Sequence, residues 1–180
     1  MSESTSSRER NLRDWLRQRG TETIEHPGGT LYAHLSRVYD RLGRLGLDDD
    51  TRLAGLAHAT YGTDGFDVVL LDRQERGTLR AIIGEPAEVL VHRYGGCDRD
   101  RTWQRLADTG EVHNRFTDQT ERLDPADLRS FTDLSIVNEL DVMEQAPSII
   151  DEHGDYFRRL FATWATIASP QVIADAQKVL

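Results

Sequence analysis

Two histidines and an asparagine occupy helical positions where the apolar repeat predicts core residues. His34 lies on the same face of a predicted helix as Leu31 and Val38. His58 lies in a second predicted helix that is apolar on most sides, and Asn138 lies on the apolar face of a later one. Burying such a side chain without a partner costs ~1–3 kcal/mol, so each needs a hydrogen bond or a ligand.

The two histidines are expected to lie at the same height on neighbouring helices. At 1.5 Å per residue, His34 is about 16 Å from the end of its helix at Leu45, and His58 is about 12 Å from the start of its own near Asp50. Across a short antiparallel turn, the two imidazoles come out nearly level. This arrangement suits a metal ion or an anionic ligand. The alternative is that each is a core histidine bonded to a carbonyl or to Asn138.

The glycine-rich loop after His58 adds two candidate catalytic residues. Tyr61 is a candidate acid or oxyanion donor, and Asp64 a candidate base or ligand. Thr-Asp-Gly is also a good turn in its own right, so this alternative stays open.

Four further polar residues are candidates for substrate binding. His26 begins a His-Pro-Gly-Gly sequence before a predicted helix start, where backbone amides favour anions, although an ordinary turn explains it as well. Arg80, Glu88 and His92 are spaced along two predicted helices and are candidates for the mouth of a pocket. The alternative is a solvated charged face.

The order of these residues resembles the HD-domain superfamily of helical metal-dependent phosphohydrolases. The resemblance rests on His34, on Ala54–Ala59 with its His58, and on Leu134–Leu140 with its Asn138, and it covers roughly residues 29–144. The spacing is also similar to that of the hydrolase domain of bifunctional ppGpp synthetase/hydrolases. The His-x-x-Tyr-Gly-Thr stretch is similar to an uncharacterised actinobacterial branch. The resemblance implies a divalent metal at His34, His58 and Asn138.

Two positions depart from the family pattern. Ala59 stands where the family has the Asp of its His-Asp pair, and Asn138 stands where it has a second Asp. Hard ions such as Mn²⁺ prefer carboxylate oxygens, so two imidazoles and an amide bind them poorly. A site for Fe, Zn or Mn therefore needs charge from a further residue. The candidates for that role are Asp64, Glu88 and His92.

The helical pattern predicts an all-α bundle, and the resemblance implies that the bundle is HD-like. About seven or eight helices are expected in a single domain over residues 9–180, after a disordered polar segment at residues 1–8. Residues 97–123 are left unassigned, with a loop or a small hairpin as alternatives after residue 110. Thr30, Asp48–Asp50 and Asp124-Pro125 are predicted helix starts.

The composition of the chain argues against some classes of binding partner. The 180 residues carry 31 acidic and 22 basic side chains, a formal charge of −9, which argues against nucleic acid. The single cysteine and the absence of a long apolar stretch predict a cytoplasmic protein with no membrane partner. The similarity to the actinobacterial branch implies a bacterial protein. The last helix is expected to expose four apolar residues, which allow a homodimer contact without requiring one: Val172, Ile173, Val179 and Leu180.

Two functions are consistent with this sequence. The first is an HD-like enzyme acting on a small anionic metabolite through the His/His/Asn site, by hydrolysis of a phosphate ester or by metal-dependent oxidation. The second is a catalytically lapsed HD-like domain that binds a small molecule or another protein.

Overall fold

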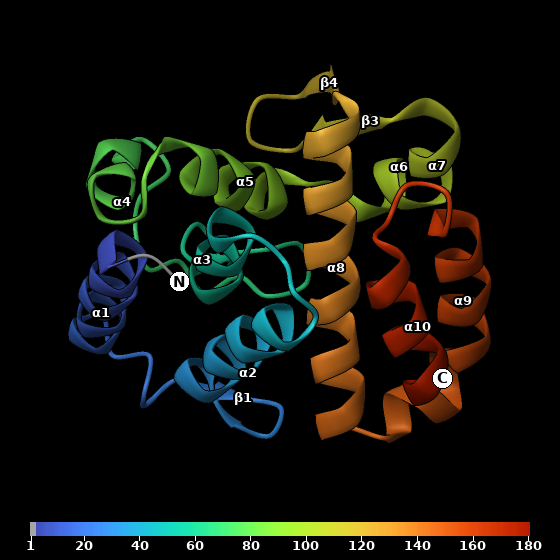
Figure 1. The fold of residues 1–180 in the computed structure, drawn as a ribbon, viewed down its shortest axis with the longest axis horizontal. Helices are drawn as coiled ribbons and strands as arrows, with labels where there is room; N and C mark the ends of the chain where they lie inside the picture. The colour runs from blue at the N-terminus through green and yellow to red at the C-terminus, as the bar shows by residue number, and fades with distance from the viewer. Residues whose placement is uncertain (1–2) are drawn as a thin grey trace. The chain divides into compact units, whose positions relative to one another are not determined.

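The computed structural model describes residues 3–180 and is mostly helical, which confirms the predicted all-α class (Figure 1). Within residues 3–180, eight helices have eight or more residues. They are α1 (Glu3–Gln18), α2 (Leu31–Arg44), α3 (Asp49–Ala57), α4 (Arg76–Ile83), α5 (Glu85–Gly96), α8 (Pro125–Gln145), α9 (Ser148–Trp164) and α10 (Pro170–Val179). No helix in this range is both long and apolar enough to cross a bilayer.

The chain divides into two compact units, Met1–Gly95 and Gly96–Leu180, and each is described by itself. In the first unit α2 packs most extensively against α3, and α1 packs against α3 and α4 (Figure 1). A short hairpin precedes α2. Its two strands, β1 (Glu25–His26) and β2 (Gly29–Thr30), have two residues each. The pairing of α2 with α3 is what brings the two candidate histidines together.

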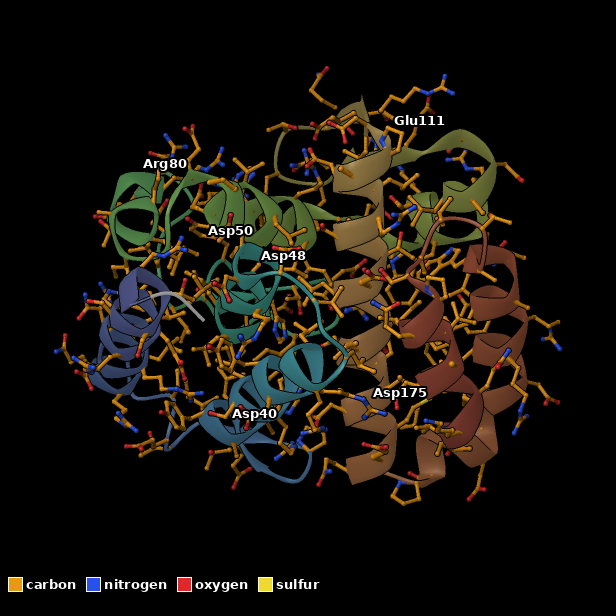
Figure 2. The ribbon with its side chains drawn as sticks, in the orientation of Figure 1. Asp40, Asp48, Asp50, Arg80, Glu111 and Asp175 are labelled. Atoms are coloured by element: carbon orange, nitrogen blue, oxygen red, sulfur yellow. The ribbon has the colours of Figure 1, made fainter. Side chains whose placement is uncertain are left out.

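The predicted caps of α2 and α3 are confirmed. The Thr30 side chain accepts a hydrogen bond from the Ala33 amide at the start of α2. The Asp48 side chain accepts one from the Thr51 amide at the start of α3, where Figure 2 labels Asp48 and Asp50. These caps satisfy amides that the helices leave without partners, so they fix where each helix begins.

The start of the chain differs from its prediction. Residues 3–8 belong to α1 and are not a disordered segment, while residues 1 and 2 lie outside the described residues. The Thr5 hydroxyl donates to Asp49 at 2.7 Å, and Arg8 donates to Asp50 and to the Ile83 carbonyl. The polar composition of this segment concealed these tertiary contacts.

Helix α4 begins later than the sequence pattern suggests. The helical pattern starts at Asp72, but the helix starts at Arg76. The Asp72 side chain accepts a hydrogen bond from the Gln74 amide instead, which holds a turn.

The second unit is built on α8, which contacts both α9 and α10 (Figure 1). Asp124 caps α8 and Pro125 opens it, as predicted. The unassigned region folds into α6 (Arg99–Thr102), a short 3-10 helix (Trp103–Arg105), α7 (Leu106–Thr109) and the hairpin β3 (Glu111–Asn114) and β4 (Gln119–Arg122). The hairpin alternative is therefore the correct one.

Helix α10 is held by its own start and by its apolar face. The Ser169 amide and hydroxyl both donate to the buried carboxylate of Asp133, at 2.8 and 2.6 Å. Val172 is buried in the core, so the prediction that it is exposed is wrong. Ile173, Val179 and Leu180 remain partly exposed, and the homodimer contact stays a prediction.

Candidate functional site

His34 and His58 meet inside the first unit, as the helical count predicted. Their Nε2 atoms lie 3.2 Å apart, which is hydrogen-bonding distance. Only 1% of His34 and 2% of His58 is exposed. The two imidazole planes are nearly perpendicular, at 83°. The helices therefore bring two buried imidazoles into direct contact.

A backbone carbonyl fixes the protonation pattern of this pair. His58 Nδ1 lies 2.8 Å from the Gly55 carbonyl oxygen, which only accepts, so Nδ1 carries the proton. In the neutral His58 ring, Nε2 then holds a lone pair. His34 Nε2–H must be the donor in the contact between the rings, which leaves the lone pair of neutral His34 on Nδ1. The pair is thus a directed chain of hydrogen bonds ending on Gly55.

His26, a candidate for substrate binding, lies beside the pair. Its ring stacks on His34 with centroids 4.0 Å apart and planes at 21°. Phe66, from the loop after His58, meets the other side of His26 edge-on at 5.2 Å. His26 is half-buried, whereas the pair is buried. It therefore stands between the pair and the surface.

Arg37 holds the turn that carries His26. Its guanidinium donates to the carbonyls of Pro27 and Gly28, at 3.2 and 3.4 Å. Both Gly28 and Gly29 have positive φ, at 79° and 126°, a conformation that glycine adopts without strain. The His-Pro-Gly-Gly sequence is thus a hairpin turn, and this turn also places His26 against His34.

Tyr61, Glu88, Arg80 and His92 form a second cluster in the same unit. The fully buried Glu88 carboxylate accepts from the Tyr61 hydroxyl at 2.8 Å and from Arg76 Nε and Nη2 at 2.7 and 2.8 Å. Arg80 Nη2 approaches the same carboxylate at 3.4 Å. The Tyr61 and His92 rings meet edge-on at 5.7 Å. Glu88 thus organises the cluster, and its oxygens are already taken by neighbouring donors.

The surroundings of this cluster shift the pKa values of Glu88, Tyr61 and His92. Burial alone raises the pKa of Glu88, but hydrogen bonds from Arg76 and Tyr61 outweigh burial and hold it below its usual value. Burial, and then the bond to Glu88, raise the pKa of Tyr61 far above its ordinary value. Burial and the Arg76 charge lower the pKa of His92. Tyr61 therefore stays protonated and Glu88 stays ionised at neutral pH.

Asp64 and Asn138 are the two remaining candidates, and a place for either of them beside the pair stays a prediction. Asp64 is half-buried in the turn closed by Thr63 and Phe66, which bond to each other through their backbones. Asn138 lies on α8 in the second unit, where its Nδ2 donates to Glu139 at 2.9 Å. The grouping of Asn138 with the two histidines stays a prediction from the resemblance.

The histidine pair does not by itself complete a metal site. A catalytic zinc takes three protein ligands, and Fe or Mn sites also use carboxylates. Among residues 3–180, no group of three His, Cys, Asp or Glu side chains lies in positions that hold a metal ion. His34 and His58 also direct their Nε2 atoms at each other. The two imidazoles alone therefore do not fit Fe, Zn or Mn, and the chemistry that their own geometry supports is that of the imidazoles.

The sequence pattern did not identify several residues that contact the histidine pair, the His26 turn or Glu88. Arg76 stands in a run of charged residues that looks like a solvated face, and Arg37 lies among the polar positions of α2. Tyr94 meets His58 edge-on at 5.4 Å, and Phe66 contacts His26. Only the position of Phe66 just after His58 hinted at its role.

Comparison with known proteins identifies one similar family. Residues 15–99 match a family described as "Domain of unknown function (DUF6817)". No curated protein and no solved structure matches the chain. The matched segment contains the histidine pair, His26 and the Glu88 cluster, whereas Asn138 lies outside it.

Proposed function

We propose that this protein is an HD-like helical enzyme that hydrolyses a small anionic metabolite, with His34 and His58 moving the proton. The observation that carries the proposal is the Nε2 to Nε2 contact of 3.2 Å between two buried imidazoles. Two imidazoles joined by one hydrogen bond take up a proton together, and imidazole is the commonest general acid and base near neutral pH.

The hydrogen-bond chain gives the pair a direction. In the neutral state the Gly55 carbonyl holds the His58 proton at Nδ1, and His34 donates to His58. The pair then acts as the base and takes a proton from the attacking water. The pair returns this proton to the oxygen that leaves the phosphorus or carbonyl carbon. The half-buried His26, stacked on His34, would orient the substrate.

The test is to incubate the protein with a panel of phosphate monoesters, phosphate diesters and carboxylate esters in the presence of a chelator. The release of product measures hydrolysis. Because the two imidazoles move the proton in this proposal, we expect at least one anionic ester to turn over with chelator present. Hydrolysis that requires added Fe, Zn or Mn would contradict proton transfer by the pair alone. Absence of hydrolysis with both chelator and metals would contradict the enzyme proposal.

One observation favours a second candidate, a lapsed domain that binds a small molecule. Each imidazole of the pair finds hydrogen bonds inside the protein, and the anionic ligands of the HD family are replaced by Ala59 and Asn138. In that case panel members would raise the melting temperature without being hydrolysed, since a ligand that binds only the folded state stabilises it.

A further inference from the structure

The Glu88 cluster presents two arginines to one carboxylate. Arg76 donates two hydrogen bonds to the Glu88 carboxylate, at 2.7 and 2.8 Å, whereas Arg80 donates one at 3.4 Å. The two arginine side chains are 31% and 41% exposed, although Glu88 is not exposed. Each guanidinium therefore has an outer edge beyond the carboxylate that the two share (Figure 2 labels Arg80).

Arg80 has donor capacity that the protein does not use. Its Nε is buried and finds no acceptor among residues 3–180. Its other carboxylate neighbour, Glu85, lies 3.7 Å away and is 70% exposed, so water screens that ion pair and an anion displaces it easily. Within the described part of the chain, the Nη groups of Arg80 have only these two long contacts, at 3.4 and 3.7 Å, so a phosphate at the exposed edge would offer them shorter charge-assisted hydrogen bonds.

The electric field around the cluster is positive on the side of His92. Burial comes first in lowering the pKa of His92, but the charges of Arg76, Arg73 and Arg93 act in the same direction, and only Glu88 opposes them. Arg80 adds to this group of arginines from α4. An anion entering here meets several guanidinium groups and one ionised carboxylate, whose charge is already paired with that of Arg76.

We infer that Arg76 and Arg80 form a phosphate-binding site, and that the ligand of this site is a phosphate monoester. The planar guanidinium fork matches two oxygens of a phosphate, which makes arginine the preferred residue for this group. The assignment of this phosphate as the substrate's own rests on the proposed function. Tyr61 connects the two regions, since it follows His58 by three residues and bonds to Glu88.

The test is titration of the full chain with inorganic phosphate by calorimetry, at constant ionic strength, with chloride as the competing anion. We expect saturable phosphate binding. Arg80→Gln should weaken it by about 10-fold, because the variant loses one charge-assisted contact. Arg80→Lys keeps the positive charge but lacks the planar guanidinium group, so its affinity for phosphate should lie between those of the wild type and Arg80→Gln. Arg80 is partly exposed and only loosely bonded, so both variants should fold, and circular dichroism checks this.

Arg10→Gln is the matched control, because Arg10 is an exposed arginine of the same unit. It should bind phosphate as the wild type does. Equal affinity of wild type and Arg80→Gln would overturn the site, as would a wild type that does not bind phosphate. An equal loss in Arg10→Gln would also overturn it, because binding would then follow net charge.

A further titration separates this inference from the proposed function. His58→Gln should bind phosphate within about 3-fold of the wild type, even where it no longer hydrolyses any ester. Binding by both proteins without hydrolysis by the wild type would leave the site in place and remove the enzyme proposal. Loss of phosphate binding in His58→Gln would place the anion at the histidine pair and overturn the assignment to Arg76 and Arg80.

Discussion

Replacing His58 with glutamine is expected to lower turnover of the hydrolysed ester by about 10²- to 10⁴-fold, the contribution typical of a positioned general base. Glutamine retains a polar side chain of similar reach but has no group that takes up a proton near neutral pH. His34→Gln should have an effect of the same size. Because the two rings act as one unit, the double variant should be little worse than either single variant.

His153→Gln serves as the control for this pair of variants. The His153 side chain is 61% exposed on α9, so its replacement should change neither turnover nor stability by a measurable amount. Unfolding in urea gives the second readout. If His34→Gln and His58→Gln lost 1–3 kcal/mol of stability, roughly the cost of an unpaired buried partner, while their turnover stayed at the wild-type level, the pair would be structural and the account would fail.

Glu88→Ala is expected to lower the free energy of unfolding by about 3–5 kcal/mol, the usual effect of removing one partner of a buried ion pair. The change leaves the inner edge of Arg76 and the Tyr61 hydroxyl without the carboxylate that now accepts from them. Chemical denaturation of the intact chain measures this difference. Glu85→Ala is the matched control, since Glu85 lies on the same helix but is 70% exposed. A loss equal in both variants would mean that Glu88 does not anchor the cluster.

The same carboxylate predicts how stability depends on pH. The pKa of Glu88 is held below its usual value in the folded protein, although burial opposes this, because Arg76 and Tyr61 bond to the ionised form. The stabilisation is therefore complete above the unfolded pKa, about 4.3 for Glu. It is lost as the pH falls through the folded value. Glu88→Gln should lack this part of the acid sensitivity, and identical acid profiles for wild type and variant would contradict the assignment.

The pairing of the two histidines was predictable because it depends on local periodicity. The helical repeat put His34 on the buried face of α2, and the caps at Thr30 and Asp48 fixed both helix starts. With a short turn between α2 and α3, counting the rise per residue was enough to place the imidazoles level. The observed Nε2 contact follows from these local features.

The Glu88 cluster was only partly predictable because its members come from separate elements. Tyr61 follows α3, Arg76 opens α4 and Glu88 lies in α5, so no single periodic pattern contains them. An arginine in a charged run looks solvated until the tertiary fold supplies a buried carboxylate. The helix at residues 3–8 was missed for a similar reason, since contacts from Thr5 and Arg8 to α3 stabilise it.

The most direct test of the central claim is a long-range ¹H–¹⁵N correlation spectrum of the side chains of the six histidines, with His34→Gln and His58→Gln used for assignment. The structure predicts the proton of His58 on Nδ1 and that of His34 on Nε2, with a ¹⁵N–¹⁵N coupling between the two Nε2 atoms across their hydrogen bond. Signals averaged over both ring nitrogens, as expected for an exposed histidine such as His153, or a proton on Nε2 of neutral His58, would contradict a directed proton-transfer pair.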